Sequence, residues 1–276
     1  MFDIAVIGAG PAGYSAAINA RKRDKSIVVI GQNTGWLTRA AHIGNYPGLP
    51  DISGQGLLDA MITQAEAMGA QLRPGVVHQI LPMGESFALS LGADFLEARR
   101  VILCTGARQP RLLPGENELL GRGVSYCGTC DGMLYRGKRV AVIAQGPEAL
   151  SEANFLASLC ESVTFFGKPN GALDSRIAVS DQKPEAILGE ARATGLRADG
   201  TDLPFDGVFI FREALALSSL LPGLKMDGAF IRVDRQMRTS VPGVFAAGDC
   251  TGAPLQVAKA VGEGCVAALC AAQELR

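Results

Sequence analysis

The sequence predicts an α/β protein with two Rossmann-like dinucleotide-binding domains of the three-layer ββα type, the second inserted in the first. Two units of strand, glycine turn, helix and strand, which begin at residues 4 and 139, predict the two domains. The third observation is a short apolar strand at 244–247 with a helical pattern behind it. This piece is too small to form a domain, so we expect it to complete the first one.

The first unit begins with the apolar run Ile4–Ile7, which is typical of a buried strand. The loop Gly8–Gly13 follows, a helical pattern continues to about Lys22, and a second apolar strand covers Ile27–Ile30. A Gly-x-Gly-x-x-Gly loop between a strand and a helix indicates a nucleotide site rather than a turn that only needs glycines. The acidic residue that would bind a ribose about 20 residues further on is replaced by Gly31-Gln32-Asn33.

Each glycine of this loop has its own role in binding a pyrophosphate. Gly8 permits the tight turn, Gly10 lets the backbone approach the phosphates, and Gly13 lets the helix pack closely on the strand. Pro11 and Ala12 complete the loop at the start of the helix. Free N–H groups and the helix dipole stabilise phosphate charge there.

The second unit repeats this order. A strand at Arg139–Ile143 leads to a turn at Gln145–Pro147, then to a helix that continues to about Leu159 and to a strand at Val163–Phe166. The final helix is expected from about Gln256 to Leu269.

We therefore assign residues 1–109 and 242–276 to the first, discontinuous domain and residues 110–241 to the inserted domain. Pro110, Pro114 and Pro242 lie near the two crossings, where loops are expected.

Composition narrows the class of protein. The chain has 276 residues, of which 48% are apolar and 19% charged, and its net charge of −1 gives no electrostatic reason to expect a nucleic acid or an anionic membrane as partner. We find no stretch long enough to span a membrane and no signal segment. Seven cysteines, five of them isolated, do not form the pattern of a secreted disulfide framework. We expect a cytoplasmic protein.

The pair Cys127-Gly128-Thr129-Cys130 is the main candidate for catalysis. Two cysteines at this spacing form a redox disulfide or half of a zinc site. Zinc needs two more ligands, and His42 and His78 have no suitable spacing to the pair or to each other. We therefore predict a redox-active disulfide and no metal. An inert pair is the remaining alternative. Asp131 is placed to exchange a proton with a thiol, or else to cap a helix.

The five other cysteines lie among small or apolar residues, where a free cysteine is usually a buried hydrophobe. They are Cys104, Cys160, Cys250, Cys265 and Cys270.

Taken in order, the motifs resemble those of the low-molecular-weight thioredoxin reductases over nearly the whole chain. The matching segments, besides the first glycine loop, are Gly44-Asn45-Tyr46-Pro47-Gly48, Cys104-Thr105-Gly106-Ala107, the redox segment Gly121–Gly132, Val241–Asp249 and Gln256-Val257-Ala258.

The resemblance implies FAD in the outer domain, with Asp249 near the ribityl chain. It implies that Cys130 is the thiol next to the flavin and that Cys127 exchanges with a partner protein. Family members are homodimers whose central domain swings to carry the dithiol between flavin and partner. The residues that the resemblance assigns to the flavin, besides the first loop, are Trp36, Leu37, Asn45, Thr105, Gly106, Gly248, Asp249, Gln256 and Val257.

The inserted domain departs from the family where NADPH should bind. The phosphate loop is Ala144–Ala149 instead of Gly-x-Gly-x-x-Ala, and Glu148 places a carboxylate at the helix start. Gly167-Lys168-Pro169 replaces the family's His-Arg-Arg, which leaves one cation and no guanidinium fork for a 2′-phosphate. Arg212 follows the strand 207–211 in place of the usual glycine. Together these changes argue against NADPH.

Trp36, next to Leu37, stands where the family has Gln-Leu beside the flavin. Its ring would stack on the isoalloxazine or shield it, and a plain core position is the alternative.

We therefore hypothesise a thioredoxin reductase-like flavoprotein that passes electrons from FAD through the Cys127–Cys130 dithiol to a thioredoxin-like protein. The departures from the NADPH site make it resemble the ferredoxin-dependent flavin thioredoxin reductases, so ferredoxin is the expected donor. The alternatives are an NADPH- or NADH-dependent reductase with an atypical site, a second flavin or other nucleotide in the inserted domain, and a non-catalytic flavin-binding redox sensor.

Overall fold

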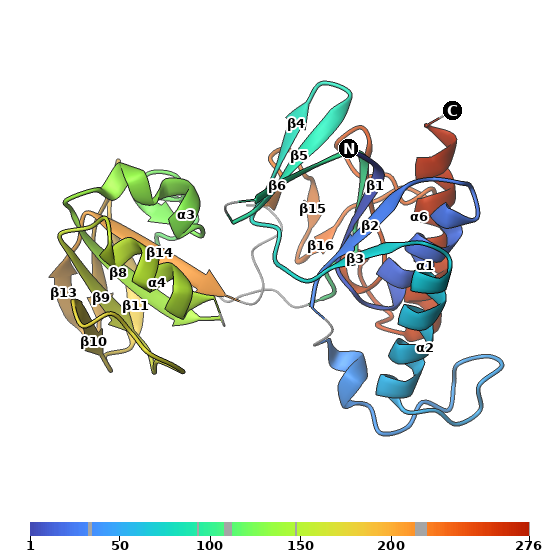
Figure 1. Cartoon of the computed structure of the whole chain (residues 1–276), viewed down its shortest axis with the longest axis horizontal. Coiled ribbons are helices and arrows are strands. Elements are labelled where there is room, and N and C mark those ends of the chain that lie inside the picture. Colours follow the sequence, from blue (N-terminus) through green and yellow to red (C-terminus); the bar gives the residue numbers. More distant parts are fainter. Residues whose placement is uncertain (33–34, 93, 108–111, 147, 213–219, 276) are drawn as a thin grey trace. The chain divides into compact units, whose positions relative to one another are not determined.

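The computed structural model describes the chain except residues 33–34, 93, 108–111, 147, 213–219 and 276. The chain forms two compact units. The first comprises Met1–Gln109 and Leu220–Arg276, and the second comprises Pro110–Ser219. The chain thus leaves the first unit, builds the second and returns (Figure 1).

The return to the first unit comes earlier than the expected crossing at residues 241 and 242. Residues from Leu220 onward already belong to the first unit. Within them, strands β15 (Met226–Asp227) and β16 (Phe230–Ile231) form a hairpin, and Ala246 N–H donates to the Met237 carbonyl oxygen at 3.0 Å. Two-residue strands have no readable period, so the sequence pattern could not reveal them.

The sheet of the first unit has the strand order β3-β2-β1-β6-β5-β4, and β17 pairs with β6. The strands β1, β2, β3, β6 and β17 run parallel, while β4 and β5 extend β6 as an antiparallel meander. Their bounds are β1 (Phe2–Ile7), β2 (Ile27–Ile30), β3 (Gln71–Arg73), β4 (Gln79–Met83), β5 (Ser86–Leu91), β6 (Asp94–Leu103) and β17 (Val244–Ala246).

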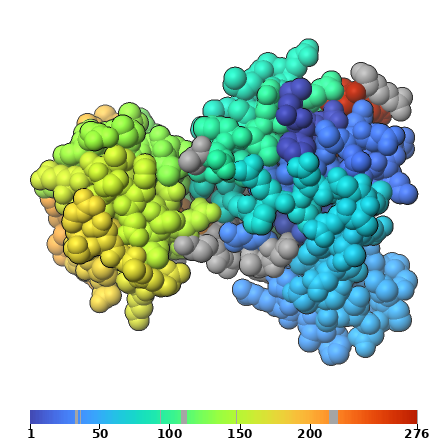
Figure 2. Space-filling model, viewed as in Figure 1, coloured from blue at the N-terminus to red at the C-terminus, as the bar shows by residue number. Residues whose placement is uncertain are grey.

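The prediction that the C-terminal piece completes the first domain is confirmed, because Val244 pairs with Val101 in the parallel sheet. Helices α1 (Pro11–Arg21), α2 (Gly54–Ala67) and α6 (Val257–Gln273) cover one face of this sheet (Figure 1). Helix α6 approaches α1 so closely that a Cβ at Gly264 would overlap the Ala12 carbonyl oxygen. The short helices are η1 (Trp36–Arg39) and η3 (Asp249–Thr251). The loop at residues 41–51 is largely exposed on the surface of this unit (Figure 2).

The second unit has a parallel sheet of order β10-β9-β8-β14-β7 and a separate antiparallel sheet of order β11-β12-β13. The parallel strands are β7 (Val124–Ser125), β8 (Arg139–Gln145), β9 (Ser162–Phe166), β10 (Ile177–Ser180) and β14 (Gly207–Arg212). The antiparallel strands are β11 (Pro184–Gly189), β12 (Ala193–Ala198) and β13 (Thr201–Pro204). The helices are α3 (Gly128–Asp131), η2 (Gly132–Tyr135) and α4 (Ala149–Ala157).

Alternation along β8 explains the three layers of this unit. Val140 and Val142 join the core that contains Leu156 of α4, whereas Ile143 joins the core that contains Leu196 of β12. Successive strand side chains point to opposite faces, so one apolar strand supplies both cores. The predicted three-layer ββα arrangement is confirmed. Among the residues described, no helix is long and apolar enough to cross a membrane.

Candidate functional site: a nucleotide loop and a dithiol

The turn between β1 and α1 requires glycine at both of its ends. Gly8 has a φ of +120°, and a Cβ there would overlap the Cys104 carbonyl oxygen. A Cβ at Gly13 would overlap the Gly8 carbonyl oxygen. At Gly10, by contrast, no described atom lies within 4 Å of the position of a Cβ. The turn is therefore closed on its inner side and open beside Gly10.

This open side is the N-terminus of α1. Gly10 is the N-cap residue and makes no side-chain cap, and Pro11 occupies the first helical position. The first N–H groups of a helix have no partner within the helix, and the helix dipole adds positive potential there. The loop can therefore bind an anionic group such as a phosphate, as its sequence predicts.

Thr105 and Gly106 lie directly after β6, beside the same turn, because Cys104 N–H donates to the Ile7 carbonyl oxygen at 2.7 Å. The Thr105 hydroxyl is buried and makes no hydrogen bond of ordinary geometry with the described residues. The Thr105 side chain instead interacts with the Cys250 thiol, where it opposes the rise that burial causes in the pKa of that thiol.

The turn after β17 is clamped by α6. Glu263 accepts a hydrogen bond from Gly248 N–H at 2.9 Å, and Lys259 donates to the Gly248 carbonyl oxygen at 2.9 Å. The adjacent Asp249 is half-buried, and this burial raises the pKa of its carboxyl, which Lys259 partly opposes. The sequence did not single out Lys259 or Glu263, whose helical spacing of four gives no functional signal by itself.

Two other residues assigned to the flavin meet each other. The Asn45 side-chain amide donates to the side-chain oxygen of Gln256 at 2.9 Å, although they are far apart in sequence. Val257 begins α6, and Leu37 is half-buried in η1 against the core of this unit. The backbone of Trp36 begins η1, but its side chain lies outside what the structure describes, so its predicted contact with a flavin stays a prediction.

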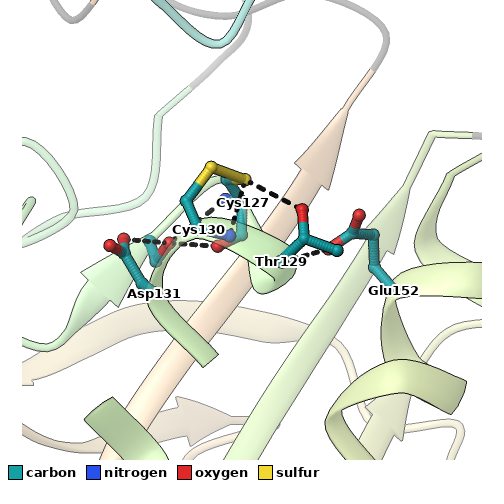
Figure 3. Close-up of a disulfide and its surroundings, with 6 residues drawn as sticks. Cys127, Thr129, Cys130, Asp131 and Glu152 are labelled. Carbon is teal, nitrogen blue, oxygen red and sulfur yellow. Dashed lines mark hydrogen bonds between the residues drawn. A yellow bond between two sulfur atoms is a disulfide. The ribbon is translucent and has the colours of Figure 1, made fainter. Parts of the chain in front are cut away.

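The redox segment lies in the second unit, where Cys127 and Cys130 form a disulfide at the start of α3 (Figure 3). Cys127 is the N-cap residue of α3, and its sulfur accepts a hydrogen bond from Cys130 N–H at 3.1 Å. The Thr129 hydroxyl lies 3.4 Å from the same sulfur. A sulfur at a helix N-terminus is favoured as a thiolate, which is the reactive form in exchange.

Asp131 is held next to the disulfide by Ser125. The buried Ser125 hydroxyl donates to the Asp131 carboxylate at 2.7 Å and also contacts the Cys127 backbone. The alternative that Asp131 caps a helix is not supported, since its side chain makes no cap hydrogen bond. Its carboxylate thus stays beside the dithiol, where a proton acceptor or donor is needed.

The exposure of the two cysteines differs from what their predicted roles would require. Cys127, expected to exchange with a partner protein, is only 5% exposed, whereas Cys130 is exposed. In this conformation an incoming thiolate has access to Cys130. The division of roles that the family resemblance implies stays a prediction.

Sequence reasoning missed the contact of Glu152 with this segment. The Glu152 carboxylate, on the first turn of α4, accepts a hydrogen bond from Thr129 N–H at 3.0 Å (Figure 3). Burial raises the pKa of this carboxyl, while hydrogen bonds from Thr129 and Gly128 oppose the shift. A glutamate on a helix gives no sequence signal of a contact with a segment 23 residues earlier.

The five remaining cysteines are free thiols that are buried or half-buried. Burial raises the pKa of Cys160 and of Cys250 to about 11, which makes both poor nucleophiles. Among the residues described, no group of three or more histidine, cysteine or carboxylate side chains is arranged to hold a metal ion.

Comparison with known proteins places this geometry in a family. The family model described as pyridine nucleotide-disulphide oxidoreductase matches residues 2–179 and 177–264. A thioredoxin reductase from Listeria monocytogenes is 33% identical over 289 residues, which cover 96% of this chain and 91% of that protein. The chain belongs to the thioredoxin reductase family of pyridine nucleotide-disulphide oxidoreductases. It is an FAD-dependent disulfide oxidoreductase.

Solved structures of thioredoxin reductases agree with this assignment. A ferredoxin-flavin thioredoxin reductase from Clostridium acetobutylicum has 41% sequence identity and a TM-score of 0.89, with 99% of this chain and 98% of that chain covered. The atypical thioredoxin reductase TRi from Desulfovibrio vulgaris Hildenborough has 34% identity and a TM-score of 0.75, with 99% of both chains covered.

The first unit of this thioredoxin reductase family member fits FAD. The open helix start beside Gly10 suits the pyrophosphate, and Thr105 lies directly after β6, beside the turn at Gly8. The turn at Gly248 and Asp249, fixed by α6, supplies a half-buried carboxylate.

In the second unit, a buried ion pair lies at the carboxyl end of β14. Arg212 ends β14, and its guanidinium donates to both carboxylate oxygens of Glu116, at 2.9 Å on one side. Its Nε donates to the Gln145 side chain at 2.9 Å, at the end of β8. The Tyr126 hydroxyl donates to Glu116 at 2.8 Å. Glu116 and Arg212 are 0% and 8% exposed.

The sequence carried a partial signal of this pair. A charged residue at the end of the otherwise apolar strand Gly207–Arg212 is costly unless it has a buried partner. Nothing around Glu116 identified it as that partner.

Proposed function

We propose that this protein is a thioredoxin reductase-like flavoprotein that carries electrons from FAD to a thioredoxin-like protein through the Cys127–Cys130 dithiol, with a donor other than NADPH. Ferredoxin is the donor we favour. The observation that carries the proposal is the buried pair of Arg212 and Glu116 in the second unit. A homodimer located in the cytoplasm belongs to the same proposal.

The position of the pair supports the loss of NADPH. In the order β10-β9-β8-β14-β7, the chain passes from β8 outward to β9 and places β14 on the other side of β8. Ligands of such sheets bind at the carboxyl ends of the strands where the order reverses. Arg212 and Gln145 end β14 and β8, and their hydrogen bond joins these two strand ends.

The charges at these strand ends and at the start of α4 also support the loss of NADPH binding. The Arg212 guanidinium donates to the Glu116 carboxylate and to Gln145, so these donors are already used and its charge is neutralised. Glu148, at the N-cap of α4, has its carboxyl pKa raised by burial and by the nearby Glu152. A dinucleotide would bring its pyrophosphate to this helix start, where two carboxylates oppose it.

The choice of ferredoxin draws on the Clostridium acetobutylicum relative, whose name specifies ferredoxin and flavin and which is 41% identical. FAD, when bound, supplies a carrier that exchanges electrons singly or in pairs, which suits a one-electron donor. No other step in the proposal depends on the identity of the donor.

A thioredoxin-like partner suits the surface around the disulfide. Cys130 is exposed, and Met133 and Leu134, three and four residues further on, are 58% and 69% exposed. Large apolar side chains next to an accessible disulfide are expected where another protein covers them. Val179, in the same unit, is 50% exposed and lies on β10, away from the redox segment in sequence.

The exchange with the partner is a pair of sulfur displacements. One thiolate of the reduced pair attacks the partner's disulfide, forms a mixed disulfide and releases the partner's other sulfur as a thiolate. The second cysteine of the pair then attacks the mixed disulfide, which restores the Cys127–Cys130 bond and releases the reduced partner. Two electrons leave this protein, and Asp131 is positioned to exchange the proton of the thiol that attacks.

Steady-state turnover tests the proposal. We expect reduced ferredoxin to support reduction of a thioredoxin disulfide by the FAD-loaded protein, and NADPH or NADH to support none above background. Met133→Asp should raise the KM for thioredoxin, while Val179→Asp should leave it unchanged. Turnover with NADPH that matches turnover with ferredoxin would contradict the proposed donor.

The flavin content of the protein tests whether the second unit binds a flavin of its own. Because Arg212 and Glu116 already use each other's hydrogen-bonding groups, we expect one FAD per chain. Release of flavin by heat, followed by its absorbance relative to protein, measures this ratio. A ratio near two would show that the second unit also binds a flavin.

A further inference from the structure

Glu152 contacts the N–H groups that begin α3, the single turn of helix that carries the redox pair. Thr129 N–H donates to the Glu152 carboxylate at 3.0 Å, while Cys130 N–H donates to the Cys127 sulfur at 3.1 Å. The N–H groups that begin α3 are thus divided between a carboxylate and a sulfur. Each N–H that serves the carboxylate is withdrawn from the stabilisation of a thiolate at Cys127.

Gly128 makes this approach of the carboxylate feasible. A Cβ at Gly128 would overlap the Glu152 carboxylate oxygen. The residue between the two cysteines is therefore fitted to a side chain on another helix. Thr129 completes the connection, because its N–H contacts Glu152 and its hydroxyl contacts the Cys127 sulfur at 3.4 Å.

We propose that Glu152 is a positioning residue that fixes the first turn of α3 and whose negative charge keeps the Cys127 sulfur protonated after reduction. This inference rests on the proposed use of Cys127 and Cys130 as the redox pair. A carboxylate close to an ionising thiol disfavours a second negative charge. The exposed Cys130 then acts as the thiolate that meets the partner.

Two other carboxylates, those of Glu148 and Asp131, lie near the first turn of α3 but in different positions from that of Glu152. Glu148 lies one turn earlier on α4 and interacts electrostatically with Glu152. Asp131, at the opposite end of α3, is held by Ser125. Burial and then the Asp131 charge raise the pKa of Tyr135 on η2. Asp131 reaches the Cys127 backbone through its own N–H and through Ser125, whereas Glu152 accepts the N–H of Thr129, whose hydroxyl contacts the Cys127 sulfur.

The rate of cysteine alkylation as a function of pH tests the inference without an electron donor or a partner protein. In the FAD-loaded Cys130→Ser background, we expect Glu152→Gln to lower the pH midpoint of Cys127 alkylation by about one unit, an increase of about tenfold in rate near neutral pH. Iodoacetamide labelling followed by peptide mass spectrometry resolves each cysteine. Failure here is distinguishable from failure of the proposed function, which is scored by turnover.

Two controls separate charge from loosened structure. Glu161→Gln removes an exposed carboxylate soon after α4 and should leave the pH midpoint of Cys127 alkylation unchanged. The alkylation of Cys160, in the same unit, serves as an internal control. In the Cys127→Ser background, Glu152→Gln should change Cys130 alkylation less than twofold. An unchanged Cys127 midpoint, or equal shifts at Cys127 and Cys130, would overturn the inference.

A second variant covers the case in which Glu152→Gln does not fold. Gly128→Ala must push the carboxylate away from the start of α3, because its Cβ takes the place of the carboxylate oxygen. We expect Gly128→Ala to lower the pH midpoint of Cys127 alkylation, as Glu152→Gln does. An unchanged midpoint in Gly128→Ala would then overturn the inference by itself.

Discussion

Arg212 and Glu116 form a bidentate ion pair in the interior of the second unit, and 96 residues of sequence separate them. The pair joins the end of β14 to the segment that leads into the redox disulfide, because Glu116 also accepts a hydrogen bond from the Tyr126 hydroxyl, next to Cys127. Burial and the Glu116 charge raise the pKa of Tyr126 beyond its ordinary range. The tyrosine therefore stays a neutral hydrogen-bond donor.

Removal of one partner of this pair should destabilise the second unit strongly. Arg212→Met leaves the Glu116 carboxylate buried and without its cation, and we expect a loss of about 3–5 kcal/mol in the free energy of unfolding. Urea unfolding monitored by circular dichroism measures it. Arg197→Met removes an exposed arginine paired with Asp202 and should cost at most about 1 kcal/mol. Equal losses of unfolding free energy in the two variants would show that the buried pair contributes no more to stability than the exposed pair.

The two dinucleotide-binding units were readable from the sequence because each begins with an apolar strand that leads directly into a glycine turn. The runs at Ile4–Ile7, Ile27–Ile30 and Arg139–Ile143, and the glycine turns behind them, defined both units. The boundary near residue 220 was not readable, since the strands of that region have two residues each. Hydrogen bonds such as those from Arg232 N–H to the Lys225 carbonyl oxygen and from Lys225 N–H to the Ser240 hydroxyl hold this region together, and no periodic pattern encodes them.

The candidate site was readable where it depends on backbone geometry. A Cβ at Gly8 or Gly13 would overlap a backbone carbonyl oxygen, so glycine at these positions by itself predicts the tight turn. Glu152 and Glu116 act through side-chain contacts over 23 and 96 residues of sequence, and Lys259 contacts a turn 11 residues before it. Such contacts depend on how the helices and strands pack, which a single sequence does not reveal.

The packing of α6 against α1 behind the FAD loop should be sensitive to a single methyl group. Gly264→Ala would place a Cβ against the Ala12 carbonyl oxygen and force the helices apart, at a cost of about 1–3 kcal/mol and with weaker FAD binding. Gly262→Ala, in the same helix, meets no described atom within 4 Å and should be neutral or stabilising by up to about 1 kcal/mol. Thermal unfolding and flavin fluorescence titration measure both effects. Indistinguishable variants would contradict this account of the packing.

The exposure of the two cysteines predicts which one a partner can trap. With thioredoxin whose attacking cysteine carries a thionitrobenzoate leaving group, Cys127→Ser retains the exposed Cys130 and should form the mixed disulfide at least about tenfold faster than Cys130→Ser. Release of thionitrobenzoate measures the rate by absorbance. Faster trapping by Cys130→Ser would instead support the exchange role that the family resemblance implies for Cys127.

Glu148 should make stability depend on pH. Burial, and then the Glu152 charge, raise the pKa of its carboxyl above the ordinary 4.5, so the folded state holds this proton more tightly than the unfolded state. The resulting contribution to stability is present below that value and is lost as pH rises through the raised pKa. Glu148→Gln should therefore be more stable than the parent at about pH 8, and the gain should shrink at about pH 4. Thermal unfolding across this range checks it, and a gain that grows toward acid pH would contradict the sign.

The donor is the central claim, and reduction of the bound flavin tests it most directly. The oxidised, FAD-loaded protein is mixed anaerobically in a stopped-flow instrument with NADPH, NADH or reduced ferredoxin, and flavin absorbance is followed. We predict bleaching by reduced ferredoxin and none by either nicotinamide at micromolar concentrations. Rapid, stoichiometric bleaching by NADPH would contradict the account.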